Sequence, residues 1–235
     1  MRVDPDSGAV LSGPMEPVYV YEAPVRLWHW VMVLCMVVLY VTGYLVGSPL
    51  ASGPGEASEN YLLGWIRFAH FAAAYVFSIM WCVRIYWAIV GNHHARQIFY
   101  LPVTKPNWWR AVLKEQIYYG FLGEGGTYVG HNPAAQIAMV SMYTVGTFFM
   151  IFTGFALYGE GLGSGSWADR LFGWVIPLFG QSQDVHTWHH LGMWYLFLFT
   201  MIHMYLANRQ DIMSNATIVS TMINGIRMFK GEERR

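Results

Sequence analysis

Four long apolar stretches constrain the fold of this chain more than any other feature. Each has roughly the 20 mostly apolar residues that a helix needs to cross a bilayer, whereas spanning β-strands would be shorter and alternate in polarity. The stretches cover about 27–47, 67–90, 134–158 and 186–207. They predict an all-α membrane protein, a four-transmembrane-helix bundle that occupies residues 27–207.

Composition supports a membrane protein and excludes several other classes. Of the 235 residues, 55% are hydrophobic and 12% are charged, against roughly 25% charged in an average soluble domain. The net charge of zero offers no basic surface to nucleic acid. Cys35 and Cys82 both lie in apolar stretches and form no Cys-x-x-Cys motif, which excludes cysteine-bound zinc, iron–sulfur clusters and covalently attached haem.

The segments outside the four spans have different expected roles. Residues 1–26 are rich in Pro, Gly and Ser and lack the apolar core of a signal peptide, so we expect a flexible lead-in. The loop 47–64 is polar, and 91–133 is expected to contain a short amphipathic helix in the membrane interface. The apolar part of 159–185 is too short to span and predicts a re-entrant or surface-lying piece. Residues 208–235 form the expected tail.

The placement of Lys and Arg predicts the orientation of the bundle, because basic residues near span ends accumulate on the cytoplasmic side. Most of them lie in the segment 91–133 and in the tail after residue 207. By contrast, the loop 47–64 has none, and 159–185 has only Arg170. Both termini are therefore predicted to face the cytoplasm.

Four of the nine histidines lie within or at the edge of a span and have an informative spacing. An imidazole in such a place is costly and usually functional. The four are His29, His70, His189 and His203. Fourteen helical residues rise roughly 21 Å and return to within about 40° of the starting direction, so His189 and His203 share one face at different depths. In the predicted topology His29 is level with His203, and His70 is level with His189. The spacing predicts two pairs, one near each membrane surface.

Two imidazoles from separate helices at one depth are what a six-coordinate haem iron needs, whereas zinc would need its ligands clustered at one centre. We therefore expect His29 and His203 to ligate the iron of an inner haem. In the same way His70 and His189 are expected to ligate the iron of an outer haem.

Two repeated patterns accompany these histidines. In "RLWH" and "RFAH", Arg26 and Arg67 each precede a histidine by three residues, so they either pair with haem propionates or extend to the membrane surface, as arginines at span ends do. The echo between "VTGYLVG" and "FTGFALYG" places Gly43 and Gly154 near the ends of two spans. Such small residues allow close approach of either a neighbouring helix or a flat ring.

The sequence leaves two interpretations for each of three more residues. His186 and His190 flank His189 in "HTWHH", and helical spacing favours His189 without deciding among them. Arg84 lies fourteen residues after His70, which places it on the same helical face at the inner depth. It either balances charge near the inner haem or extends to the membrane surface.

The chain resembles the b-type cytochrome subunit of membrane-bound nickel–iron hydrogenases, which is similar to the cytochrome subunits of membrane formate dehydrogenases. The formate dehydrogenase subunits share the histidine arrangement, so the hydrogenase assignment depends on "GHNPAAQ" and the C-terminal segment. The matching pieces are "YEAPVRLWHW" (21–30), "TGY" (42–44), "IRFAHF" (66–71), "VRIYWAIVGN" (83–92), "GHNPAAQ" (130–136), "HTWHHLGMW" (186–194) with His203, and "DIMSNATIVSTMINGIR" (211–227).

This resemblance implies a dihaem b subunit of the bacterial cytoplasmic (inner) membrane. Its family places the haem ligands at His29, His70, His189 and His203. The subunit would accept electrons from the iron–sulfur cluster of the hydrogenase small subunit during hydrogen oxidation and pass them to quinone. It would also anchor the small subunit, which has its own C-terminal membrane helix, and the large nickel–iron subunit, and would not activate hydrogen itself. The alternatives are a cytochrome b subunit of another oxidoreductase, such as formate dehydrogenase, and a haem-free membrane scaffold.

The resemblance also suggests a quinone site near the inner haem. There His131, Asn132 and Gln136 would offer hydrogen bonds to quinone carbonyls, with His131 as a proton donor, and Arg84 joins them as a candidate. The alternative for Asn132 is that it only caps the helix that begins at Pro133.

Overall fold

The computed structural model describes residues 15–51, 56, 60–123, 125–126, 128–214 and 216–230. Within them, four helices are long and apolar enough to cross a membrane, as the sequence predicted. They are Ala23–Gly47, Leu62–Val90, Pro133–Leu162 and Ser182–Ser214. Residues 1–14 of the expected lead-in and 231–235 of the expected tail lie outside the described residues.

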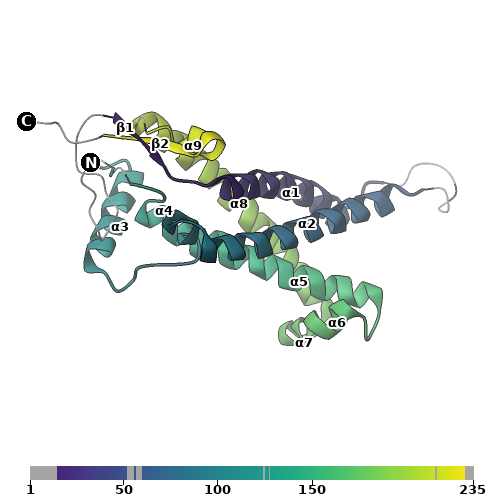
Figure 1. The fold of residues 1–235 in the computed structure, drawn as a ribbon. Coiled ribbons are helices and arrows are strands. Elements are labelled where there is room, and N and C mark those ends of the chain that lie inside the picture. The colour runs from purple at the N-terminus through teal and green to yellow at the C-terminus, as the bar shows by residue number, and fades with distance from the viewer. Residues whose placement is uncertain are drawn as a thin grey trace, which may run out of the picture. The chain divides into compact units, whose positions relative to one another are not determined.

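Three of these helices are continuous α-helices: α1 (Ala23–Gly47), α2 (Leu62–Val90) and α8 (Ser182–Ser214), as Figure 1 shows. They extend beyond the predicted spans, and α8 continues seven residues past 207. Hydropathy detects only the apolar part of a helix, whereas its backbone hydrogen bonds continue through polar turns at either end.

The third span consists of three consecutive pieces. It begins with α4 (Pro133–Ala138), continues through a π-helical turn, η3 (Met139–Thr144), and ends with α5 (Val145–Leu162). Thr144, at the end of the π-helical turn, donates a hydrogen bond to the carbonyl of Ile98 at 2.9 Å. Short π-helical turns within α-helices are often found at functional sites.

The chain divides into two compact units, and each of the four long helices contributes to both. The first unit contains the described residues of 15–29, 84–144 and 200–230, and the second contains those of 30–83 and 145–199. His29 and His203 belong to the first unit, and His70 and His189 belong to the second. Each predicted histidine pair therefore lies within one unit.

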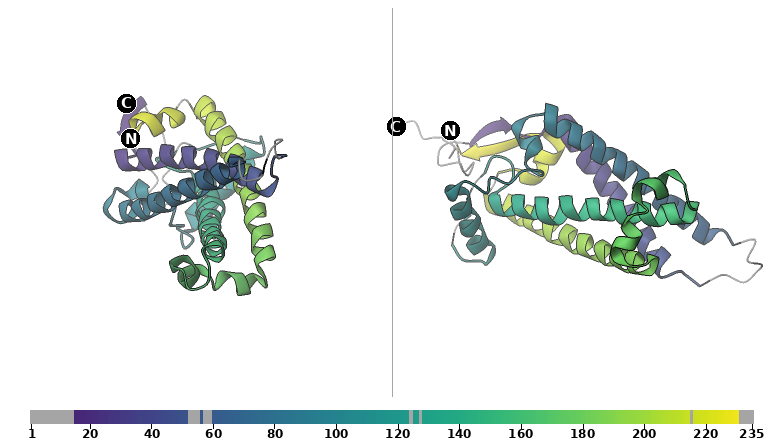
Figure 2. Two further views of the ribbon diagram at one scale, coloured as in Figure 1. Left: turned by 90° about the vertical axis from the view of Figure 1, so that its right-hand side faces the viewer. Right: turned by 90° about the horizontal axis from the view of Figure 1, so that it is seen from below.

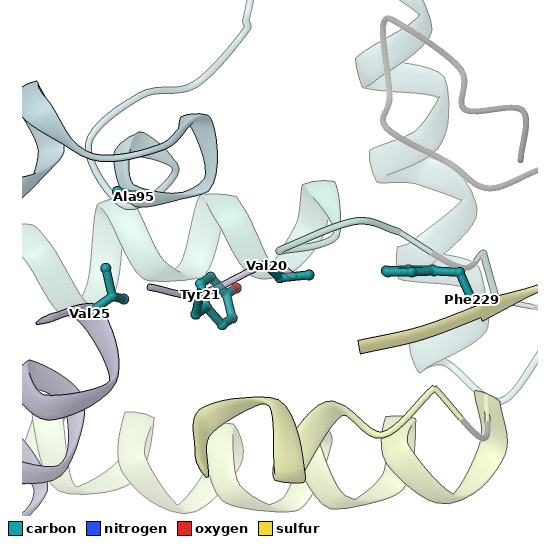
Figure 3. Close-up of a cluster of buried hydrophobic side chains, with 5 residues drawn as sticks. All are labelled: Val20, Tyr21, Val25, Ala95 and Phe229. Carbon is teal, nitrogen blue, oxygen red and sulfur yellow. The ribbon is translucent and has the colours of Figure 1, made fainter. Parts of the chain in front are cut away.

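A small sheet and a buried cluster join the two ends of the described chain within the first unit. Strand β1 (Met15–Tyr19) pairs antiparallel with β2 (Ile226–Lys230), beside helix α9 (Ile218–Asn224), as Figure 1 shows. The adjoining core, drawn in Figure 3, consists of Val20, Tyr21, Val25, Ala95 and Phe229. Part of the expected flexible lead-in is thus a strand, because β-branched and aromatic residues such as those of "VYVY" favour pairing.

Two further helical elements of the first unit occupy the segment between the second and third spans. A 3-10 turn, η2 (His93–Arg96), is capped by the side chain of Asn92. Helix α3 (Pro106–Tyr119) begins with proline in its first turn and is amphipathic. It buries Trp108, Val112, Glu115 and Tyr118 and exposes Trp109, Leu113 and Ile117.

Two short helices of the second unit pack on α5. They are α6 (Trp167–Phe172) and α7 (Val175–Phe179), which lie beside α5 in Figure 2. Phe172 of α6 stacks on Phe155 of α5, with ring centroids 5.2 Å apart. These helices form the segment in which the sequence predicted a re-entrant or surface-lying piece.

Candidate functional site

The His70–His189 pair is supported by threonines of two other helices. Nδ1 of His70 on α2 lies 2.9 Å from Oγ1 of Thr42 on α1. Nδ1 of His189 on α8 lies 2.8 Å from Oγ1 of Thr153 on α5. The two imidazoles are close enough for a Coulombic interaction between them. All four long helices therefore contribute a residue to this arrangement.

A glycine follows each of these threonines and leaves room for the histidine ring. A Cβ on Gly43 would lie 3.4 Å from Cε1 of His70. A Cβ on Gly154 would lie only 3.1 Å from Cε1 of His189, closer than ordinary van der Waals contact. The repeated Thr-Gly dipeptide thus brings each imidazole against a neighbouring helix.

The His29–His203 pair lies in an aromatic and cationic environment. His29 on α1 and His203 on α8 are close enough to interact electrostatically. Beside His29, the buried ring of Trp28 has its centroid 6.2 Å from that of Tyr143 in the π-helical turn. The guanidinium carbon of Arg84 lies 5.2 Å from the Trp28 centroid. A positive charge is therefore buried against Trp28, the residue that precedes His29.

Arg84 is a buried charged residue of the first unit. It is 2% exposed, and its guanidinium carbon also lies 5.6 Å from the ring centroid of Phe99. Its Nε and Nη1 atoms are buried and donate no hydrogen bond to any described residue. Aromatic faces stabilise a guanidinium only partly, so these N–H groups are suited to bind an anionic group.

The two arginines of the repeated Arg-x-x-His pattern have different environments. Arg26 donates a hydrogen bond from Nη1 to the carbonyl of Ile223 at 2.6 Å, and its Nε is buried without a partner among the described residues. Arg67 is exposed in the second turn of α2. The structure thus distinguishes two positions that the sequence pattern treats as equivalent.

His131 lies half-buried in a polar network just before α4. Its Nδ1 lies 3.2 Å from both the Tyr21 hydroxyl and Oε1 of Gln97. Burial lowers the pKa of His131 to about 3, and the positive charges of Arg227 and Arg84 contribute in the same direction. The imidazole is therefore neutral at pH 7, so its donor capacity is that of a neutral ring.

The side chains of Asn132 and Gln136 already have partners within the protein. Asn132 caps α4 by accepting a hydrogen bond from the amide of Ala135 at 2.7 Å, as the capping alternative proposed. Its Nδ2 donates to the hydroxyl of Tyr119 at 2.6 Å. Nε2 of Gln136 donates to the carbonyl of Tyr100 at 2.6 Å. Both amides therefore help to hold the start of the third span in place.

The two other histidines of "HTWHH" have partners within α8 itself. Nδ1 of His186 lies 3.1 Å from the carbonyl oxygen of Ser182. Nε2 of His190 accepts a hydrogen bond from the indole of Trp194 at 3.1 Å. Neither contact involves the threonine arrangement described for His189.

Comparison with known proteins agrees with this helical and histidine-rich arrangement. A family model described as prokaryotic cytochrome b561 matches residues 20–225. The chain belongs to the prokaryotic cytochrome b561 family. This family is one of membrane helical bundles, which agrees with the four long helices.

Several similar proteins carry the name "Probable Ni/Fe-hydrogenase B-type cytochrome subunit". One from Azotobacter chroococcum is 62% identical over 92% of this chain and 90% of its own length. Another from Cupriavidus necator is 57% identical over 96% of this chain and 93% of its own length. A protein of Escherichia coli, named as the corresponding subunit of Ni/Fe-hydrogenase 1, is 48% identical over 90% and 91%. These relatives confirm the resemblance recognised from the sequence.

Thr42 and Thr153, which contact His70 and His189, were not among the residues predicted from the sequence. They precede Gly43 and Gly154 in the repeated pattern. Glu22 was also missed: its carboxylate accepts hydrogen bonds from the Trp87 indole and the Asn92 amide, both at 2.9 Å. The only available signals were the recurrence of Thr-Gly and an acidic residue at the edge of an apolar span.

Proposed function

We propose that this chain is a dihaem electron-transfer subunit that connects a nickel–iron hydrogenase with membrane quinone. The observation that carries the proposal is that each histidine pair comes from two different helices and falls within one compact unit. Membership of a cytochrome b family supports haem b as the cofactor. The names of the relatives support a hydrogenase as the partner.

The residues of both pairs fit a haem better than a metal ion bound by protein ligands alone. No group of three or more His, Cys, Asp or Glu side chains suited to hold a metal occurs in the part of the chain that the structure describes. Two imidazoles per site match the axial ligands of a six-coordinate haem iron. The unused N–H groups of Arg26 and Arg84 suit the propionates of a haem held by His29 and His203.

Bound haem supplies reversible one-electron transfer at its iron. In this proposal the chain itself holds the iron with His29 and His203 in one unit and with His70 and His189 in the other. The buried charge of Arg84, which lies against Trp28, would favour the reduced state of a haem held by His29 and His203. His189 and His203, both on α8, would each contribute to holding one of the two haems.

The remaining parts of the proposal concern the surroundings of the subunit. We place both termini in the cytoplasm because most Lys and Arg residues lie in the segment 91–133 and in the tail after residue 207. The hydrogenase small subunit then delivers electrons on the outer face, nearest the His70–His189 pair. The many exposed apolar side chains of the four long helices provide contacts for lipid and for the membrane helix of the small subunit. In this role the chain anchors the complex in the inner membrane.

We also propose that quinone binds near the start of the third span. An amide nitrogen carries two hydrogens, so Asn132 and Gln136 each retain one beyond the hydrogen bond described above. His131 and Arg84 interact electrostatically, which places the buried positive charge near this segment. The neutral imidazole of His131 would act as a hydrogen-bond donor rather than as a charged acid.

Haem quantification on the purified hydrogenase complex tests the central proposal. Reduced-minus-oxidised spectra and pyridine haemochrome assays on the wild type should give two haems per chain. Single alanine variants of His29 and His203 should lose one spectral component, and those of His70 and His189 should lose the other. Haem-free but well-folded wild type would favour the scaffold alternative. Reduction of the haems by formate but not by hydrogen would instead favour a formate dehydrogenase partner.

A further inference from the structure

The hydroxyl hydrogens of Thr42 and Thr153 are both used within their own helices. Oγ1 of Thr42 lies 2.6 Å from the carbonyl oxygen of Val38, one turn earlier in α1. Oγ1 of Thr153 lies 2.8 Å from the carbonyl oxygen of Phe149, one turn earlier in α5. A carbonyl oxygen can only accept, and a hydroxyl carries a single hydrogen. Each threonine therefore donates to its own helix.

This leaves only one way for each threonine to bond its histidine. With its hydrogen already donated, the hydroxyl oxygen can act towards the imidazole only as an acceptor. Nδ1 of His70 and Nδ1 of His189 must then carry the hydrogen of these contacts, at 2.9 and 2.8 Å. In a neutral imidazole the second nitrogen is then an acceptor. Nε2 of both rings therefore presents a lone pair.

We propose that Thr42 and Thr153 are positioning residues that fix the tautomer and ring orientation of His70 and His189, so that Nε2 of each ring would hold a haem iron. The inference rests on the proposed haem-binding function. Histidine ligands commonly donate their other N–H group to a neighbouring acceptor, which sets the ring orientation and makes the ligand more basic. Here the same arrangement occurs twice, with Thr42 on α1 and Thr153 on α5 as the acceptors.

The adjacent glycines make this orientation sterically possible. A methyl group at Gly154 would crowd Cε1 of His189 at 3.1 Å, and one at Gly43 would touch Cε1 of His70 at 3.4 Å. Threonine fixes the ring by a hydrogen bond from one side, and glycine permits the ring to reach that bond. Each of the two Thr-Gly dipeptides thus orients one imidazole.

Threonines in helices often donate to the carbonyl one turn earlier for purely local reasons, so the contact with histidine must be tested separately from that bond. The chain offers two matched controls. Thr187 on α8 donates to the carbonyl of Gln183 at 3.0 Å and is exposed, two residues before His189. Ser78 on α2 donates to the carbonyl of Ala74 at 2.8 Å. Each makes the same local bond as Thr42 and Thr153.

The test uses the purified hydrogenase complex with Thr42→Val and Thr153→Val, their Ser counterparts, and the controls Thr187→Val and Ser78→Ala. Valine retains the branched shape of threonine but removes the hydroxyl, and with it both the bond to the helix carbonyl and the acceptor for the imidazole. The two controls remove only the bond to the helix carbonyl. The readouts are haem per chain, the midpoint potential of each haem in a redox titration, and the electron paramagnetic resonance spectrum of the oxidised protein, which reports ring orientation.

We expect both valine variants to raise the midpoint potential of the same haem, because a less basic imidazole stabilises the oxidised iron less. That haem should be the one that alanine variants of His70 and His189 lose. Its resonance spectrum should also change. The Ser variants should restore the wild-type potential and spectrum, and both controls should match the wild type.

Valine variants with the haem content, potentials and spectrum of the wild type would overturn the inference while leaving the proposed function intact. If the valine variants lose the haem entirely, the Ser variants decide: recovery supports a role for the hydroxyl, and equal loss shows that only packing is involved. A wild-type protein without haem would instead refute the proposed function itself.

Discussion

The two compact units differ sharply in the polar groups that they bury. In the second unit, every buried polar residue among those described is a threonine: Thr42, Thr147 and Thr153. The buried charged residues of the described chain all belong to the first unit, and they are Arg84, Glu115 and Arg227. The first unit therefore holds charge in its interior, and the second holds hydroxyl groups.

This difference has a physical meaning. A threonine that donates to its own helix satisfies its hydrogen without help from another element, so it is inexpensive to bury. A buried charge is costly unless a specific interaction retains it. Burial raises the pKa of Glu115, which accepts a hydrogen bond from the amide of Gly126 at 2.7 Å. Among the described residues, the buried Arg and Glu side chains are therefore confined to the first unit.

The largest effect is expected from overpacking the second unit without adding a polar group. Gly154→Val would place a branched side chain where even a Cβ lies 3.1 Å from His189. We expect loss of the haem at the His70–His189 pair and a destabilisation of about 1–3 kcal/mol, typical of overpacking. Haem per chain should fall from two to one, while the spectrum of the other haem remains.

Gly161→Val is the matched control for this prediction. Gly161 also lies in α5, and a Cβ there would meet no atom within 4 Å. This variant should retain both haems. Full haem content in the Gly154→Val protein would show that the imidazole does not need the close approach to α5.

A smaller effect is expected from removing the buried charge of the first unit. Arg84→Gln should lower the midpoint potential of the haem at the His29–His203 pair, because a nearby positive charge favours the reduced state. The expected shift is on the order of 59 mV, which corresponds to a tenfold change in a one-electron equilibrium. Redox titration of both haems measures it, and the other haem should change little.

Two variants control for changes other than charge. Arg84→Lys keeps the positive charge and should shift the potential less than Arg84→Gln does. Arg96→Gln removes an exposed arginine that donates to the carbonyls of Ala88 and Ile89, and it should leave both potentials unchanged. An unaltered potential in Arg84→Gln would mean that the buried charge does not act on this haem.

Much of this architecture could be predicted from the sequence because hydropathy and helical period are local properties. The four spans required only stretches of about 20 apolar residues. The predicted histidine pairs required helical spacing together with the orientation of the spans inferred from Lys and Arg. The contacts that distinguish the units are different in kind. Arg26 bonds the carbonyl of Ile223, 197 residues later in the chain, and Met15 pairs with Lys230 in the sheet. No local pattern encodes such partners.

The threonines illustrate an intermediate case. Their recurrence before Gly43 and Gly154 was visible in the sequence as a repeated dipeptide. Its meaning depended on which imidazole each hydroxyl meets, and the partners are 28 and 36 residues away. The π-helical turn Met139–Thr144 had no sequence signal at all, since its residues are ordinary for a membrane span.

The smallest expected effect is on the pH dependence of the free energy of unfolding. Burial lowers the pKa of His131 from its ordinary 6.5 to about 3. Between these values the unfolded chain binds a proton that the folded chain does not, so the free energy of unfolding falls as the pH falls below 6.5. The slope contributed by this residue is at most about 1.36 kcal/mol per pH unit. Thermal unfolding of the purified complex at pH 7 and 5.5 measures the difference.

His131→Gln removes this titration and should make the loss of stability between pH 7 and 5.5 smaller by about 1 kcal/mol. His93→Gln is the control, because His93 is an exposed histidine on η2 of the same unit. Its pH dependence should match that of the wild type. An unchanged pH dependence in His131→Gln would mean that the imidazole gains a proton in the folded protein, and the polar interior of the first unit would then be open to water rather than sealed.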